Sequence, residues 1–132
     1  MLENIELTSK AKSGILYVIG TPIGNLEDIT LRALSVLKTV DWIAAEDTRH
    51  TGKLLHSFGI KKPMLSYFEH NKKSQSGQII ELLRHGNSVG LVTDAGMPGI
   101  SDPGADLIRD CLAENLPVSV IPGPTAFVTA LV

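Results

Sequence analysis

The stretch Leu91-Val-Thr-Asp-Ala-Gly-Met-Pro-Gly-Ile-Ser-Asp-Pro-Gly104 predicts a buried strand, a long loop and the start of a helix. It contains three glycines, two prolines and two aspartates. Glycine lets a backbone approach a ligand closely, and proline holds a loop in one shape at low entropic cost. A connection that only reverses the chain needs far less of this chemistry, so the stretch predicts a binding loop.

Two shorter loops of the same kind occur elsewhere in the chain. Gly20-Thr-Pro-Ile-Gly-Asn25 follows the apolar run 15–19, and Pro122-Gly-Pro-Thr-Ala126 follows the apolar run 118–121. In open parallel sheets, ligands bind beyond the carboxyl ends of the strands, where the strand order switches. We therefore expect the three loops to form one binding rim.

Strand patterns and helix patterns alternate along the whole chain. Strands are expected at 15–19, 42–45, 63–67, 89–93 and 118–121, and helices at about 30–38, 48–58, 74–85, 102–115 and from 124. Such alternation predicts an α/β fold with right-handed crossovers. The expected architecture is a five-stranded, mostly parallel sheet with helices on both faces.

Two helix starts have specific sequence signals. Thr30 is expected to cap the first helix, whose apolar side would consist of Leu31, Leu34 and Leu37. Asp102 is expected to cap a later helix, with Pro103 at its first position.

Composition indicates one folded domain of 14–132 preceded by a flexible arm of 1–13. The chain has 132 residues, 43% of them apolar, and a formal net charge of −2. This charge excludes a globally basic nucleic-acid binder but leaves room for a local basic patch. Cys111 is the single cysteine, and its helical apolar pattern predicts a place in the core.

The distribution of apolar residues also predicts where the protein works and whether the chain is part of a longer one. No apolar run reaches the roughly 18 residues that a membrane span needs, and 1–13 has no signal-peptide core, so we expect a cytoplasmic protein. The apolar, periodic stretch 125–132 has no helix-end signal. We therefore expect this chain to be the first domain of a longer protein whose C-terminal domain is absent here.

Several motifs are excluded. Neither the dinucleotide fingerprint G-x-G-x-x-G nor the phosphate loop G-x-x-x-x-G-K-[ST] is present. The histidines show no metal-ligand spacing, so no metal site is expected; they are His50, His56, His70 and His85.

Each charged residue near a strand end has two possible roles, one structural and one functional. Asp94 either accepts hydrogen bonds from a ligand or ties down its own loop. Glu46 and Asp47 either cap the next helix and pair with Arg49 or act at the rim, and Glu69 has the same ambiguity. The pairs 61–62 and 72–73, all lysine, are either solvated charges or phosphate contacts.

Four segments together resemble the tetrapyrrole-methylase-like, S-adenosylmethionine-dependent methyltransferases. They are Gly14-Ile-Leu-Tyr-Val-Ile-Gly-Thr-Pro-Ile-Gly-Asn-Leu-Glu-Asp-Ile-Thr30, Ala45-Glu-Asp-Thr-Arg49, Thr93-Asp-Ala-Gly-Met-Pro-Gly-Ile-Ser-Asp-Pro-Gly104 and Pro122-Gly-Pro-Thr-Ala126. Within that family they are most similar to the branch that methylates a cytidine ribose 2′-hydroxyl of 16S ribosomal RNA. The resemblance implies a two-domain enzyme with S-adenosylmethionine in the cleft between the domains.

The resemblance also implies cofactor contacts in all three loops. By motif position these are Pro22 in the first loop, Gly96, Met97, Pro98, Ile100 and Ser101 in the second, and Thr125 and Ala126 in the third. Porphyrin-type members have Gly-Asp-Pro in the second loop, where this chain has Gly-Met-Pro. That departure favours the RNA branch and suggests that Asp94 supplies the missing acceptor.

For the reaction, the resemblance implies attack of a ribose 2′-hydroxyl on the sulfonium methyl group. A carboxylate near the hydroxyl would take its proton, and the candidates are Glu46, Asp47 and Glu69. Arg49 and Lys53, with the lysine pairs, would attract phosphates of the small-subunit ribosomal RNA.

Two other functions stay open at this point: a methylase of a small tetrapyrrole, and a non-catalytic module that binds a nucleoside or pairs with itself. We expect the isolated 132-residue piece to bind S-adenosylmethionine weakly or not at all and to transfer no methyl group. Apolar surface near 121–132 favours self-association, so a homodimer is expected.

Overall fold

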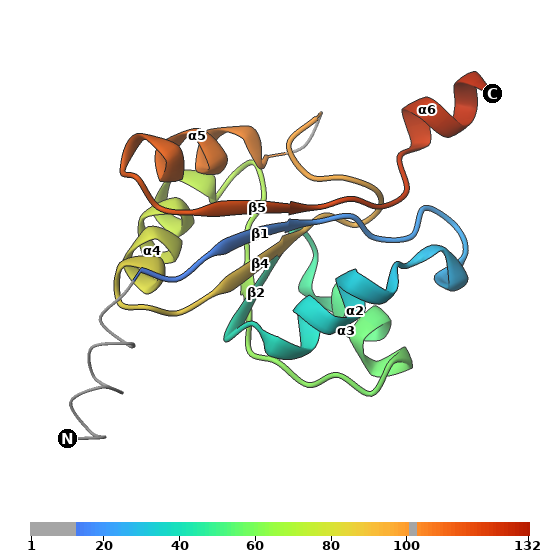
Figure 1. The fold of residues 1–132 in the computed structure, drawn as a ribbon, viewed down its shortest axis with the longest axis horizontal. Coiled ribbons are helices and arrows are strands. Elements are labelled where there is room, and N and C mark those ends of the chain that lie inside the picture. Colours follow the sequence, from blue (N-terminus) through green and yellow to red (C-terminus); the bar gives the residue numbers. More distant parts are fainter. Residues whose placement is uncertain (1–12, 101–102) are drawn as a thin grey trace.

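Five parallel strands form one sheet in the computed structural model, which describes residues 13–100 and 103–132 (Figure 1). The strand order is β3-β2-β4-β1-β5, and all four neighbouring pairs are parallel. The strands are β1 (Leu16–Ile19), β2 (Trp42–Ala45), β3 (Met64–Ser66), β4 (Val89–Val92) and β5 (Val118–Ile121). The predicted α/β class and the five-stranded sheet are confirmed.

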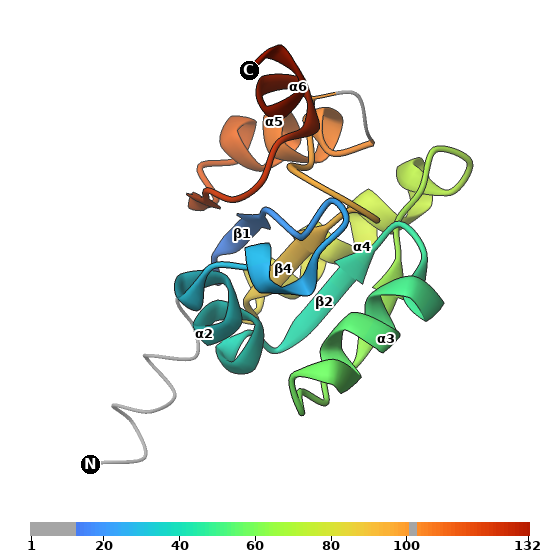
Figure 2. The same ribbon diagram turned by 90° about the vertical axis from the view of Figure 1, so that its right-hand side faces the viewer.

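Helices cover both faces of this sheet, as predicted (Figure 1, Figure 2). One face packs against α2 and α3, and the other against α4 and α5. The helices are α2 (Leu31–Thr39), α3 (Thr48–Ser57), α4 (Lys72–Arg84), α5 (Ala105–Ala113) and α6 (Ala126–Leu131). A short 3-10 helix, η1 (Leu26–Asp28), follows β1 and was not predicted, because only the Asn25 side chain accepting from the Glu27 amide marks its start.

Each face of the sheet has its own apolar core. The core under α4 and α5 consists of Leu16, Val18, Ala44, Tyr67, Ile79, Ile80, Leu83, Val89, Leu91, Leu107, Cys111 and Leu116. The core under α2 and α3 consists of Ile19, Ile29, Ala33, Leu37, Val40, Ile43, Ala45, Leu54, Leu55, Ile60, Val92 and Ile121. Cys111 is fully buried, as predicted, and burial raises the pKa of its thiol to about 11.

The start of α2 is predicted correctly, and its buried side is predicted in part, because Leu37 is buried and Leu34 packs partly against the core. Thr30 Oγ1 accepts a hydrogen bond from the Ala33 amide at 3.0 Å, which is the expected cap. Leu31 is nevertheless 86% exposed, whereas Ala33 and Leu37 are buried. The reason is that residues four apart share a helix face, and the sheet selects the face of Ala33 and Leu37.

The start of α5 lies later than predicted. The helix begins at Ala105 with Gly104 as its N-cap, so the expectation that Pro103 opens it is wrong. A Cβ on Gly104 would lie 2.9 Å from the Gly99 amide nitrogen, so the incoming loop folds back against this glycine before the helix starts. Asp102, the expected cap, lies outside the described residues.

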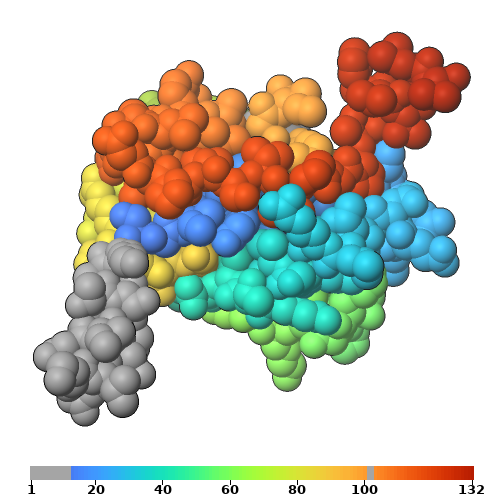
Figure 3. All heavy atoms as spheres, in the orientation of Figure 1, coloured from blue at the N-terminus to red at the C-terminus, as the bar shows by residue number. Residues whose placement is uncertain are grey.

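The last helix is placed differently from the others. Thr125 Oγ1 accepts from the Val128 amide at 3.3 Å and caps α6. The helix stands clear of the rest of the domain (Figure 3), with Phe127 71% and Leu131 72% exposed. The expected apolar surface near 121–132 is therefore present. In the part of the chain that the structure describes, no helix is long and apolar enough to span a membrane.

The sheet has a topological switch point between β1 and β4. These strands are neighbours, yet the helix after β1 packs on one face and the helix after β4 packs on the other. The loops that leave the two strands therefore diverge at the carboxyl edge of the sheet. Open α/β sheets bind ligands at such a point. The loops after β1, β4 and β5 all begin at this place.

Candidate functional site

The loops after β1 and β4 are joined by a short antiparallel bridge. The amide of Thr21 donates to the Gly96 carbonyl and the amide of Gly96 donates to the Thr21 carbonyl, both at 3.0 Å. Thr21 Oγ1 also donates to the Thr93 carbonyl at 3.2 Å. Gly96 has a φ of 82°, which favours glycine at this position. The two loops thus act as one structural unit.

The loop after β5 packs against the same unit. The Gly20 amide donates to the Ile121 carbonyl at 3.1 Å. A Cβ built on Gly20 would lie 2.8 Å from the Gly123 Cα and 2.6 Å from the Met97 sulfur. Because two glycines meet here, the backbones of the first and third loops touch directly. All three loops converge, as the sequence predicts.

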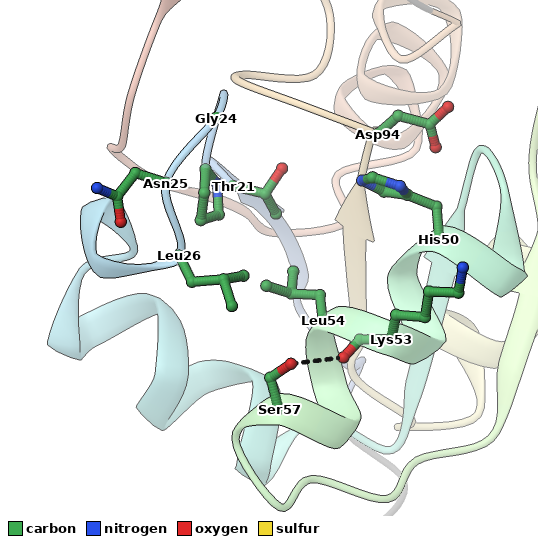
Figure 4. A pocket seen from close by; sticks show the side chains of 10 residues that line it. Thr21, Gly24, Asn25, Leu26, His50, Lys53, Leu54, Ser57 and Asp94 are labelled. Atoms are coloured by element: carbon green, nitrogen blue, oxygen red, sulfur yellow. Dashed lines mark hydrogen bonds between the residues drawn. The ribbon is translucent and has the colours of Figure 1, made fainter.

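A cavity of about 320 Å³ opens beside this junction, between the first loop and α3 (Figure 4). Its lining combines an apolar floor with polar groups, which is typical of small-molecule sites. The lining residues are Thr21, Pro22, Gly24, Asn25, Leu26, His50, Lys53, Leu54, Ser57 and Asp94. Figure 4 shows His50 and Asp94 close together on one side of it.

Asp94 has the most unusual environment in this cavity. Its Oδ1 is buried, as is the Thr93 hydroxyl, and neither has a hydrogen-bond partner among the residues that the structure describes. Buried polar atoms are nearly always paired, and an exception points to a functional role or to a missing ligand. This observation favours a ligand-accepting role for Asp94 over a purely structural one.

The expected cofactor residues occupy three kinds of position. Pro22 and Asp94 line the cavity. A second group is buried or half-buried at the loop junction and consists of Gly96, Met97 and Pro98. Thr125 is half-buried and caps α6. Exposed are Ile100 and Ala126, whereas Ser101 lies outside the described residues.

Glu46 is the base candidate that contacts the backbone of Asp94 in the cavity lining. It is half-buried at the end of β2, and its Oε1 accepts a hydrogen bond from the Asp94 amide at 3.3 Å. This bond holds the Glu46 carboxylate against the backbone of Asp94, which lines the cavity.

Asp47 caps α3, which is the structural reading of this residue. Its Oδ1 accepts from the Arg49 amide at 2.9 Å and from the His50 amide at 3.4 Å. The backbone hydrogen bond from Arg49 is the main reason that the pKa of Asp47 lies below its usual value of 3.8. A carboxylate with a lowered pKa is a weaker proton acceptor, so Asp47 is poorly suited to act as a base.

Asp47 also makes acid stability testable. A carboxyl group whose pKa is lowered by folding stabilises the protein above the unfolded pKa, near 3.8, and this stabilisation is lost as the pH falls through the folded value. We expect wild type to be more stable than Asp47→Asn at pH 6 and the difference to shrink as the pH falls below 3.8, measured by urea unfolding. A constant difference across this range would contradict the assignment.

Glu69 lies in an ion-pair network away from the cavity. Its Oε1 is 3.0 Å from Lys72 Nζ, which also lies 2.9 Å from Asp106 Oδ2. The hydrogen bonds to Asp106 and then to Glu69 raise the pKa of Lys72 to about 12. This network links the start of α4 to α5, and Glu69 is absent from the lining of the cavity.

The two expected phosphate contacts lie on α3. Arg49 is exposed beside Asp47, with 3.7 Å between its Nε and Asp47 Oδ1. Lys53 is exposed one turn later and lines the cavity. The sequence also predicted no metal site, and within residues 13–100 and 103–132 no group of three His, Cys, Asp or Glu is placed to hold a metal ion.

Sequence reasoning missed several lining residues, namely Asn25, Leu26, His50, Leu54 and Ser57. Three of them belong to α3, and their spacing along the helix is the only signal. His50 and Ser57 are seven residues apart, which places both on one side of a helix. The first loop lies opposite this side of α3 because of the strand order, which the sequence does not show.

The fold and the rim define an α/β domain with a ligand site at a topological switch point. A uroporphyrin-III-C-methyltransferase from Thermus thermophilus has the same fold, with a TM-score of 0.69 and 25% identity over 86% of this chain and 49% of that one. Residues 15–132 match the family model described as Tetrapyrrole (Corrin/Porphyrin) Methylases. The chain belongs to this family, which confirms the resemblance drawn from its motifs.

Curated relatives are similar at a higher level of identity. Ribosomal RNA small subunit methyltransferase I of Synechocystis sp. is 53% identical over 90% of this chain and 43% of its own length. The Bacillus subtilis protein of the same name is 51% identical over 97% of this chain and 44% of its own length. The chain thus spans about half the length of the curated relatives it matches.

Proposed function

We propose that this chain supplies half of the active site of a methyltransferase. The donor is S-adenosylmethionine, and the acceptor is a cytidine ribose 2′-hydroxyl in 16S ribosomal RNA. The observation that carries the proposal is the convergence of three glycine-containing loops at the switch point, beside a cavity whose Asp94 has a buried carboxylate oxygen without a described partner. The names of the relatives at 51–53% identity support the RNA acceptor.

The residues at the junction fit an adenosyl donor. Asp94 Oδ1 is an acceptor suited to a hydroxyl or amino group. The contact between Gly20 and Gly123 holds the first and third loops together at the same edge of the sheet. S-adenosylmethionine would supply an electrophilic methyl group there. The residues that would hold it are Pro22, Asp94, Gly96, Met97, Pro98, Ile100, Ser101, Thr125 and Ala126.

The chain's own side chains have distinct tasks in this proposal. Asp94 binds and orients the donor through its carboxylate. Glu46 takes the proton of the attacking hydroxyl, held in place by the Asp94 amide. Arg49 and Lys53 attract the phosphates of the RNA, which approaches from the α3 side of the cavity.

The proposal extends to the protein that contains this chain. A second domain completes the donor cleft, the protein works in the cytoplasm as a homodimer, and the isolated chain has little affinity for S-adenosylmethionine. The exposed apolar side chains of α6, such as Phe127 and Leu131, support a contact with further protein at this end.

A methyl-transfer assay tests the acceptor. The protein in its full natural length is incubated with tritiated S-adenosylmethionine and either small ribosomal subunits or uroporphyrinogen. We expect label in 16S ribosomal RNA, at a linkage that resists alkali because its 2′-hydroxyl is methylated. Label in the porphyrinoid alone would overturn the proposal, and so would no label in either acceptor.

Asp94→Asn tests the donor site. Losing a charged hydrogen bond costs about 1.5–3 kcal/mol, so in the protein of full natural length we expect about 10- to 150-fold weaker binding of S-adenosylmethionine by calorimetry. Because Oδ1 has no described partner, thermal stability without ligand should stay equal or rise. Asp28→Asn, at an exposed position on η1, is the control and should change neither value. Unchanged affinity in Asp94→Asn would contradict this role.

A further inference from the structure

Residues 48–63 have an unusual charge composition. The segment contains Arg49, Lys53, Lys61 and Lys62, with two histidines and no aspartate or glutamate. The whole chain has a net charge of −2, so positive charge is concentrated here against the overall balance. A local basic patch of this kind is the electrostatic footprint of a polyanion partner.

The fold arranges these cations in a line. On α3, Arg49, Lys53 and His56 follow one another at i, i+4 and i+7 on the exposed side, while the opposite side packs into the core. The helix runs from the carboxyl edge of the sheet to its amino edge, a length of about 15 Å for 10 residues. Lys61 and Lys62 continue the line just before β3. We call these five residues the basic ridge.

Most of the basic ridge is not paired with acidic side chains in the part of the chain that the structure describes. Among the described residues, Lys53, Lys61 and Lys62 form no ion pair, and Arg49 has only its loose contact with Asp47. On the other face of the sheet, three of the four cations of α4 and α5 are neutralised instead, and Lys73 is the exception. Lys72 pairs with Glu69 and Asp106, Arg84 with Glu81 and Glu114, and Arg109 with Asp106.

The ridge is flanked by hollows on both sides. On one side lies the cavity between the first loop and α3, which has His50 and Lys53 in its lining. Both side chains lie on the side of α3 that faces Asp94 (Figure 4). On the other side, a hollow of about 490 Å³ is lined by residues that include His56, Lys61 and Lys62. A chain lying along α3 would therefore meet positive side chains from the candidate site to the far edge of the sheet.

We infer that the basic ridge binds the phosphate backbone of RNA next to the nucleotide that is methylated. This inference rests on the proposed RNA acceptor. It assigns Lys61, Lys62 and His56, at the edge of the sheet opposite the loop junction, to the same binding surface as Arg49. The four lysine and arginine side chains of the ridge, with no acid among them in the sequence, complement a repeating row of phosphates, whereas protein surfaces present both signs of charge. The ridge also starts beside the candidate site, so the bound strand would lead into it.

Salt-dependent binding tests the ridge. The double variant Lys61→Gln, Lys62→Gln is compared with the double variant Arg84→Gln, Arg109→Gln, which removes the same charge from the opposite face. Both are made in the protein of full natural length, and transcribed 16S ribosomal RNA is the probe in filter binding from 50 to 300 mM KCl. Each lost phosphate contact lowers the slope of log K against log salt by about 0.7–0.9.

We expect the ridge variant to lose the slope that two phosphate contacts contribute and at least about tenfold in affinity at 100 mM KCl, and the control to keep both. Equal losses in the two variants, or no loss in the ridge variant, would overturn the inference. Methyl transfer to small subunits at saturating concentration separates this result from the proposed function. If the wild type transfers methyl groups to RNA while ridge variant and control bind alike, only the ridge is wrong; if the wild type transfers none, the proposed function fails.

Discussion

Gly20→Ala is expected to abolish measurable methyl transfer and to lower the free energy of unfolding by about 2–3 kcal/mol. The new Cβ would lie 2.6 Å from the Met97 sulfur, 2.8 Å from the Gly123 Cα and 2.9 Å from the Gly123 nitrogen. A methionine side chain can move aside, but the backbone of Gly123 cannot without displacing the third loop. The substitution therefore forces apart the two loops on which the donor site depends.

In the protein of full natural length, the methyl-transfer assay and urea unfolding measure these two effects, and calorimetry with S-adenosylmethionine measures donor binding separately. Gly77→Ala is the matched control, because its Cβ would meet no atom within 4 Å. In the interior of α4 this change should stabilise the protein by up to about 1 kcal/mol and leave binding intact. Wild-type affinity in a folded Gly20→Ala protein would show that the convergence of the loops is not needed for binding.

The convergence itself could be predicted from the sequence, and the reason is geometric. Continuous apolar runs at 15–19, 89–93 and 118–121 indicate parallel strands, and the carboxyl ends of parallel strands lie at one edge of a sheet. Loops that follow such strands must meet there. The prediction needed only the alternation of strands and helices, which local patterns show well.

The cavity could not be predicted in the same way, because it depends on strand order. Leu26 and Leu54 face one another only because β4 alone separates β1 from β2, which brings α3 opposite the first loop. Local patterns do not encode this order. The two local errors have a similar origin: the sheet chose which side of α2 to bury, and contact with Gly99 decided where α5 begins.

The roles of the three carboxylates also depended on tertiary contacts. Nothing in the sequence distinguishes Glu46, Asp47 and Glu69, since each follows a strand. The structure separates them: Asp47 bonds the backbone of its own helix, Glu69 pairs with Lys72, and Glu46 contacts the backbone of Asp94 at the cavity. Asp47 reaches the cavity lining only as the cap of α3, through the His50 amide, whereas the Glu46 contact joins the end of β2 to Asp94 in the loop after β4.

Glu46→Gln is therefore expected to lower kcat for methyl transfer by at least about 100-fold, the lower end of what a general base contributes. The amide oxygen of glutamine can still accept from the Asp94 amide, so the loop and the affinity for S-adenosylmethionine should stay unchanged. The acidic limb of the pH–rate profile should disappear, because the titrating base is gone.

Asp47→Asn and Glu69→Gln serve as controls, each keeping kcat within about threefold, since exposed ion pairs contribute little. If Glu69→Gln or Asp47→Asn removed the acidic limb while Glu46→Gln kept it, the base would be the residue so identified, and the contact between Glu46 and Asp94 would be purely structural.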